Sequence, residues 1–347
     1  MNHAAPAPDI RILGVGTQLP GDPVDNAALA RQFGLDAAGE QWIDAFIGTR
    51  GRHFGFDLAT GRRDWSLADL GAGAGARALR AAGVEPDEVD LLVMGTWSPD
   101  QLVPATVNVI ADRLGVNDVP SYQLQSGCSG AVQALDLAHQ LLQTGRHRTA
   151  LVIGADTCAK HYRADMRTQG MEPAKLINAL LFGDGAGAVV LSTRTPPGAP
   201  ALRHVLVRLT GLGREPGQST EWFGWGDERT EDVPILEDYK AIEQFVPKMA
   251  QETFEQLLRE LDWAPEDADY LLPPQLSGRM TERIVAQLDV PHMRPISRVR
   301  EIGNTGNSSP FFQIEQLLPM MMPGDRAVAV AIESSKWIKS GFAVEKV

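Results

Sequence analysis

Cys128 is the residue whose type and surroundings point most directly to chemistry. It lies in the run Gln125-Ser-Gly-Cys-Ser-Gly130, just before residues 131–144, whose pattern predicts an amphipathic helix. The positive end of that helix favours the thiolate, which is the nucleophilic form of cysteine. Gly127 and Gly130 permit the tight, exposed turn that a nucleophile needs. The alternative is a buried cysteine that packs as a small hydrophobic side chain.

The chain contains an internal duplication. Pro86 and its neighbours match Pro265, Gly145 and its neighbours match Gly324, and both pairs are 179 residues apart. Each half has the same order of predicted elements: amphipathic helix, Pro-acidic turn, strand, helix, strand, loop, helix, Gly turn, strand. This alternation predicts an α/β protein with parallel sheets covered by helices.

The same offset takes Cys128 to Asn307, in the Gly-rich loop 303–310 that precedes a predicted helix over 311–318. If the two halves pack about a pseudo-twofold axis, both loops meet in one cleft. The duplicated core predicts two units, residues 1–195 with Cys128 and residues 196–347 with Asn304. A loop inserted at 213–235 is expected to lie over the site, and it contains Trp222, Phe223 and Trp225.

Composition excludes several classes of protein. The 347 residues are 44% hydrophobic and 22% charged, as in soluble globular proteins, and no apolar run approaches the ~18 residues of a membrane helix. The first residues lack the pattern of a secretory signal. Two cysteines, Cys128 and Cys158, fit a reducing compartment, so we expect a cytoplasmic protein. The net charge of −12 argues against nucleic-acid binding.

Two motifs that suggest other enzymes are rejected. Residues 183–188 fit a G-x-G-x-x-A dinucleotide fingerprint, but a strand over 189–192 follows where a helix is required. Those glycines are expected to let a strand pass close beneath the catalytic loops. A serine-hydrolase elbow would need glycine at Ser126. With no zinc spacing either, we expect no bound cofactor or metal.

The motifs together resemble the β-ketoacyl-acyl-carrier-protein synthase III branch of the thiolase superfamily. The resemblance rests on residues 42–54, the Cys128 loop, residues 183–187 and residues 303–305. It implies a duplicated, five-layered α-β-α-β-α fold in a cytoplasmic homodimer. It also implies that Cys128 carries an acyl thioester received from coenzyme A or acyl carrier protein.

The resemblance also suggests how the substrate binds. In many members the residue at Trp42 stacks on the coenzyme A adenine, and a nearby arginine, here Arg50 or Arg52, meets the phosphates. The alternative for Trp42 is a half-buried helix aromatic. The basic cluster of Arg50, Arg52, Arg62 and Arg63 is a candidate patch for an acidic carrier protein, or simply a solvated face.

The chain departs from the family at the catalytic histidine. Condensing members use Cys, His and Asn, and Asn304 matches the asparagine, but Pro274 stands where the histidine belongs. Residues 333–337 replace the usual glycines, so Ser335 is our candidate for the second N–H of the oxyanion hole. Candidates for assisting an acceptor are His161, Asn307 and Glu333. Solvent-facing loop positions are the alternative for His161, and also for His53 and His292.

Proline offers no donor in place of imidazole, and the loss of one oxyanion donor typically costs ~10²–10³ in rate. Acylation of Cys128 demands less than decarboxylation, so we expect an acyltransferase. It would move an acyl group through Cys128 to an oxygen, nitrogen or sulfur acceptor, on a small molecule or second carrier protein, in specialised-metabolite biosynthesis. The alternatives are a decarboxylative Claisen condensation and a non-catalytic partner subunit of a ketosynthase.

Overall fold

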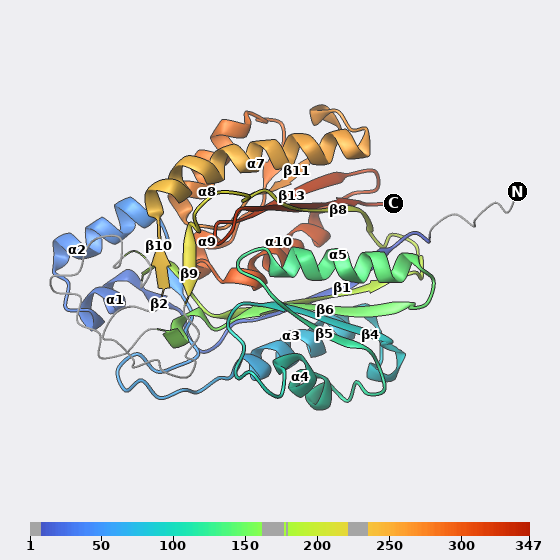
Figure 1. The fold of residues 1–347 in the computed structure, drawn as a ribbon, viewed down its shortest axis with the longest axis horizontal. Coiled ribbons are helices and arrows are strands. Elements are labelled where there is room, and N and C mark those ends of the chain that lie inside the picture. Colours follow the sequence, from blue (N-terminus) through green and yellow to red (C-terminus); the bar gives the residue numbers. More distant parts are fainter. Residues whose placement is uncertain (1–7, 162–176, 178–179, 221–234) are drawn as a thin grey trace, which may run out of the picture.

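The computed structural model describes residues 8–161, 177, 180–220 and 235–347 (Figure 1). Ten strands form one sheet in the order β12-β11-β13-β14-β8-β1-β7-β6-β4-β5. The strands of the first half are β1 (Arg11–Gln18), β4 (Leu91–Thr96), β5 (Ser121–Gln125), β6 (Thr149–Asp156) and β7 (Gly185–Ser192). Those of the second half are β8 (Ala201–Leu209), β11 (Tyr270–Leu272), β12 (Arg294–Pro295), β13 (Arg326–Glu333) and β14 (Ile338–Glu345).

The sheet consists of two five-stranded sets with the same topology. In the first set β5, β4 and β6 are parallel to one another, β7 pairs antiparallel with β6, and β1 pairs antiparallel with β7. In the second set β12, β11 and β13 are parallel to one another, β14 pairs antiparallel with β13, and β8 pairs antiparallel with β14. One residue pair, Arg11 with Ala201, joins the sets through β1 and β8. The expectation of parallel sheets is therefore only partly right, because a tight turn such as that between β13 and β14 reverses the chain direction.

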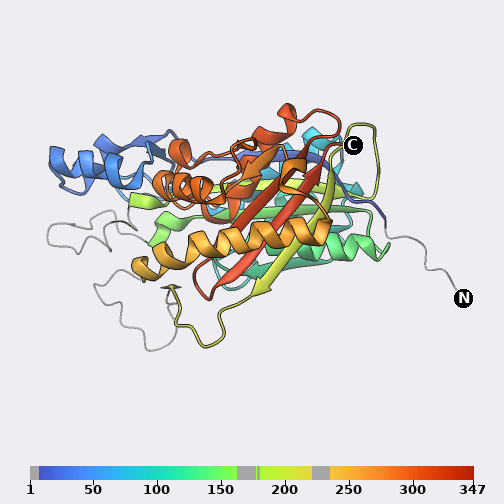
Figure 2. The ribbon, with the colours of Figure 1, turned by 90° about the horizontal axis from the view of Figure 1, so that it is seen from above.

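The longer helices form three layers around these sets. They are α3 (Leu67–Ala82), α4 (Thr106–Leu114), α5 (Gly130–Gln143), α7 (Tyr239–Leu261), α8 (Gly278–Leu288) and α10 (Ser309–Leu317). Helices α5 and α10 share one apolar core with both sets of strands. Helices α3 and α4 cover the outer face of the first set, and α7 and α8 that of the second (Figures 1 and 2). The mixed α/β architecture is the five-layered, thiolase-like one predicted.

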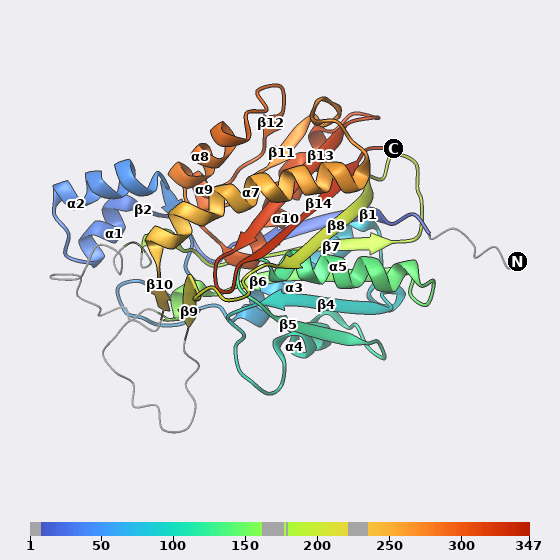
Figure 3. The ribbon, with the colours of Figure 1, turned by 45° about the horizontal axis from the view of Figure 1, so that its top comes forward.

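Short elements gather at one end of the molecule. They are β2 (Val24–Asp25), α1 (Asn26–Gln32), α2 (Ala37–Trp42), the π-helical turn η1 (Ile43–Ile47), β3 (Gly51–Arg52) and the two-stranded ribbon β9 (Gln218–Thr220) with β10 (Ile235–Glu237). Figure 3 shows α1 and α2 at the same end as this ribbon and the start of α7. The remaining short turns are η2 (Pro86–Glu88), η3 (Cys158–His161), η4 (Pro265–Asp267), α9 (Val299–Ile302), η5 (Gly306–Ser308) and η6 (Leu318–Met320).

Strand pairing refines the duplication. Leu91 pairs with Ala150, and Tyr270 pairs with Ala327. The offset of 179 therefore holds for β4 and β11, and for the starts of α5 and α10. It is wrong for β6 and β13, which are 177 residues apart because the helix and the connection after it are together two residues shorter in the second half. The last residues of these strands, Asp156 and Glu333, are therefore equivalent.

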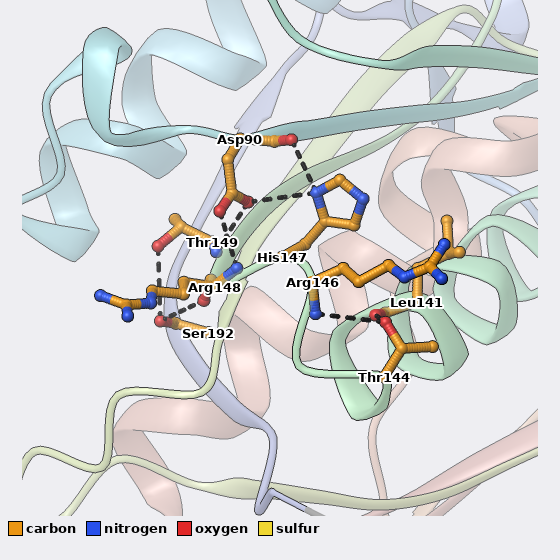
Figure 4. A network of polar contacts seen from close by, with 8 residues as sticks. All are labelled: Asp90, Leu141, Thr144, Arg146, His147, Arg148, Thr149 and Ser192. Atoms are coloured by element: carbon orange, nitrogen blue, oxygen red, sulfur yellow. Dashed lines mark hydrogen bonds and ion pairs between the residues drawn. The ribbon is translucent and has the colours of Figure 1, made fainter.

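An aspartate fixes the register of each half at the end of the sheet away from Cys128. The Asp90 carboxylate accepts hydrogen bonds from the backbone N–H groups of Arg148 (2.8 Å) and Thr149 (3.1 Å), and His147 Nδ1 lies 3.0 Å from the Asp90 carbonyl oxygen (Figure 4). In the second half Asp269 accepts from the Arg326 N–H at 2.9 Å. These bonds anchor the starts of β6 and β13.

The glycines of residues 183–187 behave as expected. β7 begins at Gly185, so the segment is a strand and not the start of a helix. A Cβ at Gly187 would lie 2.4 Å from the Phe311 Cβ, and one at Gly185 would lie 3.0 Å from Ser308 Oγ. Glycine therefore lets β7 pass directly beneath η5 and α10. The prediction that these glycines permit a close approach is confirmed.

Candidate active site

One cavity brings together loops from both halves of the chain. Its polar lining includes Cys128, Asn304, Ser334 and Glu237, and Pro274 forms part of the same wall. The apolar lining includes Leu181, Phe182, Ile242, Leu276 and Met280. The centre of a water molecule can reach about 70 Å³ of this space. The cavity is therefore a narrow, mostly apolar chamber with a thiol and several side-chain amides, among them Asn304, in its wall.

The Cys128 loop is held by Glu333 from the opposite half. α5 begins at Gly130 with Ser129 as its N-cap residue, so Cys128 lies directly before the helix. Glu333 accepts hydrogen bonds from Ser126 Oγ (2.9 Å), the Ser129 N–H (3.3 Å) and Ser129 Oγ. Because Glu333 is only 3% exposed, this carboxylate fixes the loop from inside the protein.

The structure corrects the prediction that the helix favours the thiolate of Cys128. Burial raises the pKa of this thiol well above its ordinary value, and the negative charges of Glu333, Asp156 and Glu237 raise it further. A helix end stabilises a thiolate by typically less than about 1 kcal/mol, which desolvation beside three carboxylates outweighs. Cys128 therefore rests as a thiol and needs a proton acceptor before it can attack.

Asn304 presents one amide donor to the cavity. Backbone bonds to its neighbours, Gly183 N–H to Asn304 O (2.9 Å) and Asn304 N–H to Leu181 O (3.2 Å), fix its position beside β7. Its Oδ1 accepts from the Gly306 N–H at 3.0 Å, and Nδ2 donates to none of the residues that the structure describes. The free Nδ2 can therefore donate to an oxygen of a bound substrate.

Asn307, which we considered as an aid to the acceptor, is wholly engaged elsewhere. Its Oδ1 accepts from the Ala131 N–H at 2.8 Å, and its Nδ2 donates to Asp156 Oδ2 at 2.8 Å. Asn307 is fully buried and is not part of the cavity wall. The expectation is wrong because the oxygen and the nitrogen of the side-chain amide both bind residues of the first half and so link the two halves.

Pro274 closes one wall of the cavity without a side-chain donor. The adjacent Gln275 fixes this segment, because its Oε1 accepts from Ser297 Oγ (3.0 Å) and from the N–H groups of Arg298 (2.8 Å) and Val299 (2.9 Å). The Pro274 carbonyl in turn accepts from Thr281 Oγ1 at 2.7 Å. The backbone here is fixed, and Pro274 lines the chamber that holds Cys128 and Asn304.

The turn after β13 differs in detail from the prediction. Ser334 lines the cavity, whereas the hydroxyl of Ser335 donates to Glu333 and Ser335 is not part of the wall. Glu333, another candidate for assisting the acceptor, accepts hydrogen bonds from the hydroxyls of the Cys128 loop and does not line the cavity. Ser334 is thus the better placed residue for a second oxyanion contact.

Arg52 is not a phosphate ligand. It is fully buried, its Nε donates to the Leu180 carbonyl and one guanidinium nitrogen donates to Asn26. Burial lowers the pKa of Arg52 to about 10. The prediction is wrong for this residue because the Arg52 side chain points from β3 into the protein interior. Arg50 does face the surface, where a shallow pocket is lined by Asp44, Gly48, Arg50, Arg279 and Arg300.

Trp42 is half-buried and already stacked within the protein. Its ring is nearly parallel to that of Phe46, with ring centroids 5.2 Å apart and an angle of 11° between the planes. The Phe46 and Tyr239 ring centroids are 6.4 Å apart. Trp42 also packs on the apolar cluster of Leu29, Phe33 and Ile43. This arrangement favours the alternative of a half-buried helix aromatic, with Tyr239 linking it to the cavity.

Of the histidine candidates, His53 and His292 do not line the cavity. His53 is buried with Nδ1 3.1 Å from the Pro20 carbonyl, and His292 contacts the Pro265 carbonyl at 3.0 Å beside η4. His161 ends η3, and its side chain lies outside the described part of the chain. Trp222, Phe223 and Trp225 of the inserted loop also lie outside it, although the ribbon β9–β10 that frames them reaches the cavity.

Glu237 and Tyr239 are site residues that the sequence reasoning missed. Both line the cavity with Cys128, and burial raises the pKa of Glu237 to about 7. Nothing in the sequence marked Glu237, because an acidic residue before a helix is common. Here Asp238 caps α7 by accepting from the Ala241 N–H at 3.0 Å. Among the described residues no three His, Cys, Asp or Glu side chains gather to bind a metal, and no helix is long and apolar enough to span a membrane.

Comparisons with known proteins agree with this geometry. Residues 122–207 match the model of 3-oxoacyl-[acyl-carrier-protein (ACP)] synthase III, and residues 258–334 match that of its C-terminal part. The chain is 54% identical to AbyA1, a tetronic acid condensing enzyme, over 97% of this chain and 99% of that one, with a TM-score of 0.94.

More distant structures show the same fold. The priming β-ketosynthase of the R1128 polyketide pathway is 24% identical over 100% of this chain and 99% of its own, with a TM-score of 0.83. Synthase III (FabH) from Pseudomonas aeruginosa PAO1 is 25% identical over 97% and 98%, with a TM-score of 0.81. The chain belongs to the 3-oxoacyl-[acyl-carrier-protein] synthase III family.

Proposed function

We propose that this protein is a condensing acyltransferase that works without decarboxylation. The observation that carries the proposal is the composition of one cavity wall: Cys128 and Asn304 face the same chamber, and Pro274 stands where the family resemblance places a histidine. A nucleophile and one amide donor suffice to form and resolve an acyl-enzyme. Release of CO₂ from a malonyl group would develop an enolate, which this wall meets with the Asn304 amide but without an imidazole.

Loading and transfer both pass through the sulfur of Cys128. The thiol attacks the carbonyl of an acyl thioester, and the carrier leaves as a thiol. The mostly apolar walls suit an extended acyl chain, and Asn304 Nδ2 and the backbone around Ser334 are placed to contact oxygens. An acceptor then attacks the acyl group and frees Cys128. These steps need no metal or redox cofactor.

The 54% identity to a tetronic acid condensing enzyme supports a definite choice of acceptor. A tetronic acid is a five-membered lactone, and two thioesters can build it by forming one C–O bond and one C–C bond. We propose that Cys128 passes a β-ketoacyl group to the hydroxyl of an α-hydroxyacyl thioester. The methylene between the two carbonyls then loses a proton and attacks the remaining thioester carbonyl, which closes the ring as the C–S bond to the acceptor's carrier breaks and the carrier leaves as a thiol. Because that methylene is already acidic, decarboxylation is not required.

The thioesters are proposed to arrive on acyl carrier protein or coenzyme A. Both carry the acyl group on a phosphopantetheine arm, and Arg50, Arg279 and Arg300 form a basic pocket suited to phosphate or to acidic side chains. Arg300 also pairs with Glu282, and Asp44 lies in the same pocket, so the patch is not uniformly basic. The proposal therefore assigns binding mainly to Arg50 and Arg279.

A homodimer is also proposed. β5 lies at one edge of the ten-stranded sheet, its residues are largely exposed, and an exposed strand edge is a template for pairing with a second copy. Leu102 and Val103, in the loop that precedes α4, are 67% and 85% exposed. Apolar side chains beside an unpaired edge support association of two chains through β5.

Paired thioester assays test the proposed reaction. The purified protein is incubated with acetoacetyl-N-acetylcysteamine, and the adduct is located by intact-mass and peptide analysis. Lactoyl-N-acetylcysteamine is then added, and the released product is analysed. We expect an acetoacetyl adduct on Cys128 and a methyl-substituted tetronic acid. A β-keto product that forms only with malonyl thioester would instead support the decarboxylating reaction.

A further inference from the structure

Glu237 is a carboxylate in the chamber of Cys128 with no assigned role. It is the last residue of β10 and pairs with Gln218 of β9, which lines the same chamber. Two backbone bonds anchor the ribbon: Gly217 N–H to Ser334 O (3.0 Å) and Asp238 N–H to Gly217 O (2.8 Å). Glu237 is thus fixed between the turn after β13 and the capped start of α7.

The Glu237 carboxylate has no protein partner in the described part of the chain, where no hydrogen bond or ion pair reaches it. A partly buried carboxylate in a mostly apolar chamber, with no partner among the described residues, is a candidate for a functional role. Burial raises its pKa to about 7. Its charge can therefore change at neutral pH.

The other carboxylates near Cys128 are engaged. Asp156 accepts from Thr96 Oγ1 (2.9 Å), Ser98 Oγ (2.9 Å) and the Asn307 N–H (2.8 Å). Glu333 accepts from the Cys128 loop and from Ser335, and neither carboxylate lines the chamber. Among the described lining residues Glu237 is the one carboxylate.

We propose that Glu237 is the general base of this enzyme. It removes the proton of Cys128 during loading and, on the basis of the proposed function, the proton of the acceptor hydroxyl during transfer. The resting thiol of Cys128 requires such an acceptor, and the wall at Pro274 offers none. Glu237 thus performs, from an inserted ribbon of the second half, the proton transfer that the family's histidine does not provide here.

The proton returns in each half-reaction. In loading, the S–H proton moves to Glu237, the sulfur attacks the thioester carbonyl, the donor's C–S bond breaks, and Glu237 protonates the departing carrier thiolate. In transfer, the acceptor O–H proton moves to Glu237 and the oxygen attacks the acyl carbonyl. The bond between the acyl carbon and the Cys128 sulfur breaks, and Glu237 returns the proton to the sulfur. No oxidant or reductant is involved.

The titratable groups that interact with Glu237 are Cys128 and Tyr239. Both have pKa values raised by burial, and the Glu237 charge raises them further. Both therefore remain protonated near neutrality, while Glu237 changes its charge. The loading rate should consequently follow the ionisation of Glu237 and rise with pH through about 7.

The test measures single-turnover loading of Cys128 by acetoacetyl-N-acetylcysteamine as a function of pH, using intact-mass detection. Glu237→Gln keeps the shape of the side chain but cannot accept a proton. Glu243→Gln, on the exposed face of α7 where Glu243 pairs with Arg283, is the matched control. We expect Glu237→Gln to load roughly 10²–10⁴-fold more slowly and to lose the inflection near neutral pH. Glu237→Asp should recover part of the rate together with the inflection, which a purely structural role would not produce.

Two results overturn the proposal. One is a Glu237→Gln protein that loads within about threefold of the wild type with the same pH profile. The other is a wild-type loading rate without an inflection between about pH 6 and 8, a result that does not depend on the folding of any variant. Loading involves no acceptor, so these outcomes are separate from the proposed function. A wild type that loads normally but makes no lactone contradicts that function and leaves the base assignment standing.

Discussion

Asp156 and Glu333 end the central strands of the two halves at equivalent positions, and each carboxylate binds the helix-leading loop of the other half. Asp156 Oδ2 accepts from the Asn307 N–H at 2.8 Å, and Glu333 Oε2 accepts from the Ser129 N–H at 3.3 Å. The duplicated fold thus cross-links its two active-site loops with a pair of buried carboxylates. The arrangement positions Cys128, and it also surrounds the thiol with negative charge.

Removal of the Glu333 charge should make Cys128 more reactive. Burial raises the pKa of the thiol most, and Glu333 is the largest of the charges that add to it. In Glu333→Gln the thiol pKa falls, so the thiolate fraction at a given pH rises. We expect alkylation by iodoacetamide near pH 8 to accelerate by about 10-fold.

Peptide mapping should locate the extra label on Cys128, because Cys158 is fully buried. Glu252→Gln, which changes an exposed partner of Lys339, serves as the control. An unchanged or slower alkylation of a folded Glu333→Gln protein would show that the carboxylate does not control the thiol.

Asn307 should matter for stability and not for proton transfer. Asn307→Ala removes the bonds to the Ala131 N–H and to Asp156, and leaves both groups buried. We expect the free energy of unfolding to fall by about 2–4 kcal/mol in urea titrations. The loading rate per folded molecule should remain close to that of the wild type. A folded variant with a strongly reduced loading rate would show that Asn307 takes part in the acylation of Cys128.

Asn304 can be tested with a variant that preserves its internal bond. In Asn304→Asp the carboxylate can still accept from the Gly306 N–H, but the Nδ2 donor is lost. We expect product formation to fall by about 10²–10³-fold, as for other oxyanion donors, with an unchanged thermal midpoint. Comparable activity in the two proteins would mean that Nδ2 does not contact the substrate.

The oligomeric state tests the edge strand. We expect light scattering to give twice the 37.6 kDa of one chain. Gln125→Pro removes a backbone N–H from the outer edge of the sheet, because the N–H groups that face β4 belong to alternate residues such as Ser126, and it should shift the protein towards the monomer. A wild-type monomer at micromolar concentration would refute the dimer.

The sequence predicted the elements whose signals are local. The predicted Pro-acidic turns are the equivalent 3₁₀ turns η2 and η4 of the structure. The Gly-rich loops around Cys128 and Asn304 line one cavity, as predicted. These features depend on glycine, proline and the period of apolar residues, which act over a few neighbouring positions. The same motifs placed the chain in its family.

The incorrect predictions concern relationships across the fold. The helix end suggested a thiolate at Cys128, but burial raises the pKa of the thiol, and the charges of Glu333 and Asp156, from other strands, raise it further. Arg52 has the right residue type for a phosphate, yet its side chain points into the core. Glu237 gave no signal, because an acidic residue before a helix is common and its burial depends on the packing of the β9–β10 ribbon.

The most direct test of the central claim is the release of carbon dioxide from carboxyl-labelled malonyl thioester by the unmodified protein with Cys128 already acylated. Our account predicts no release above that of Cys128→Ala, while an α-hydroxyacyl thioester offered in parallel is converted to a lactone. Robust release that depends on Cys128 would contradict it and show that this cavity decarboxylates despite Pro274.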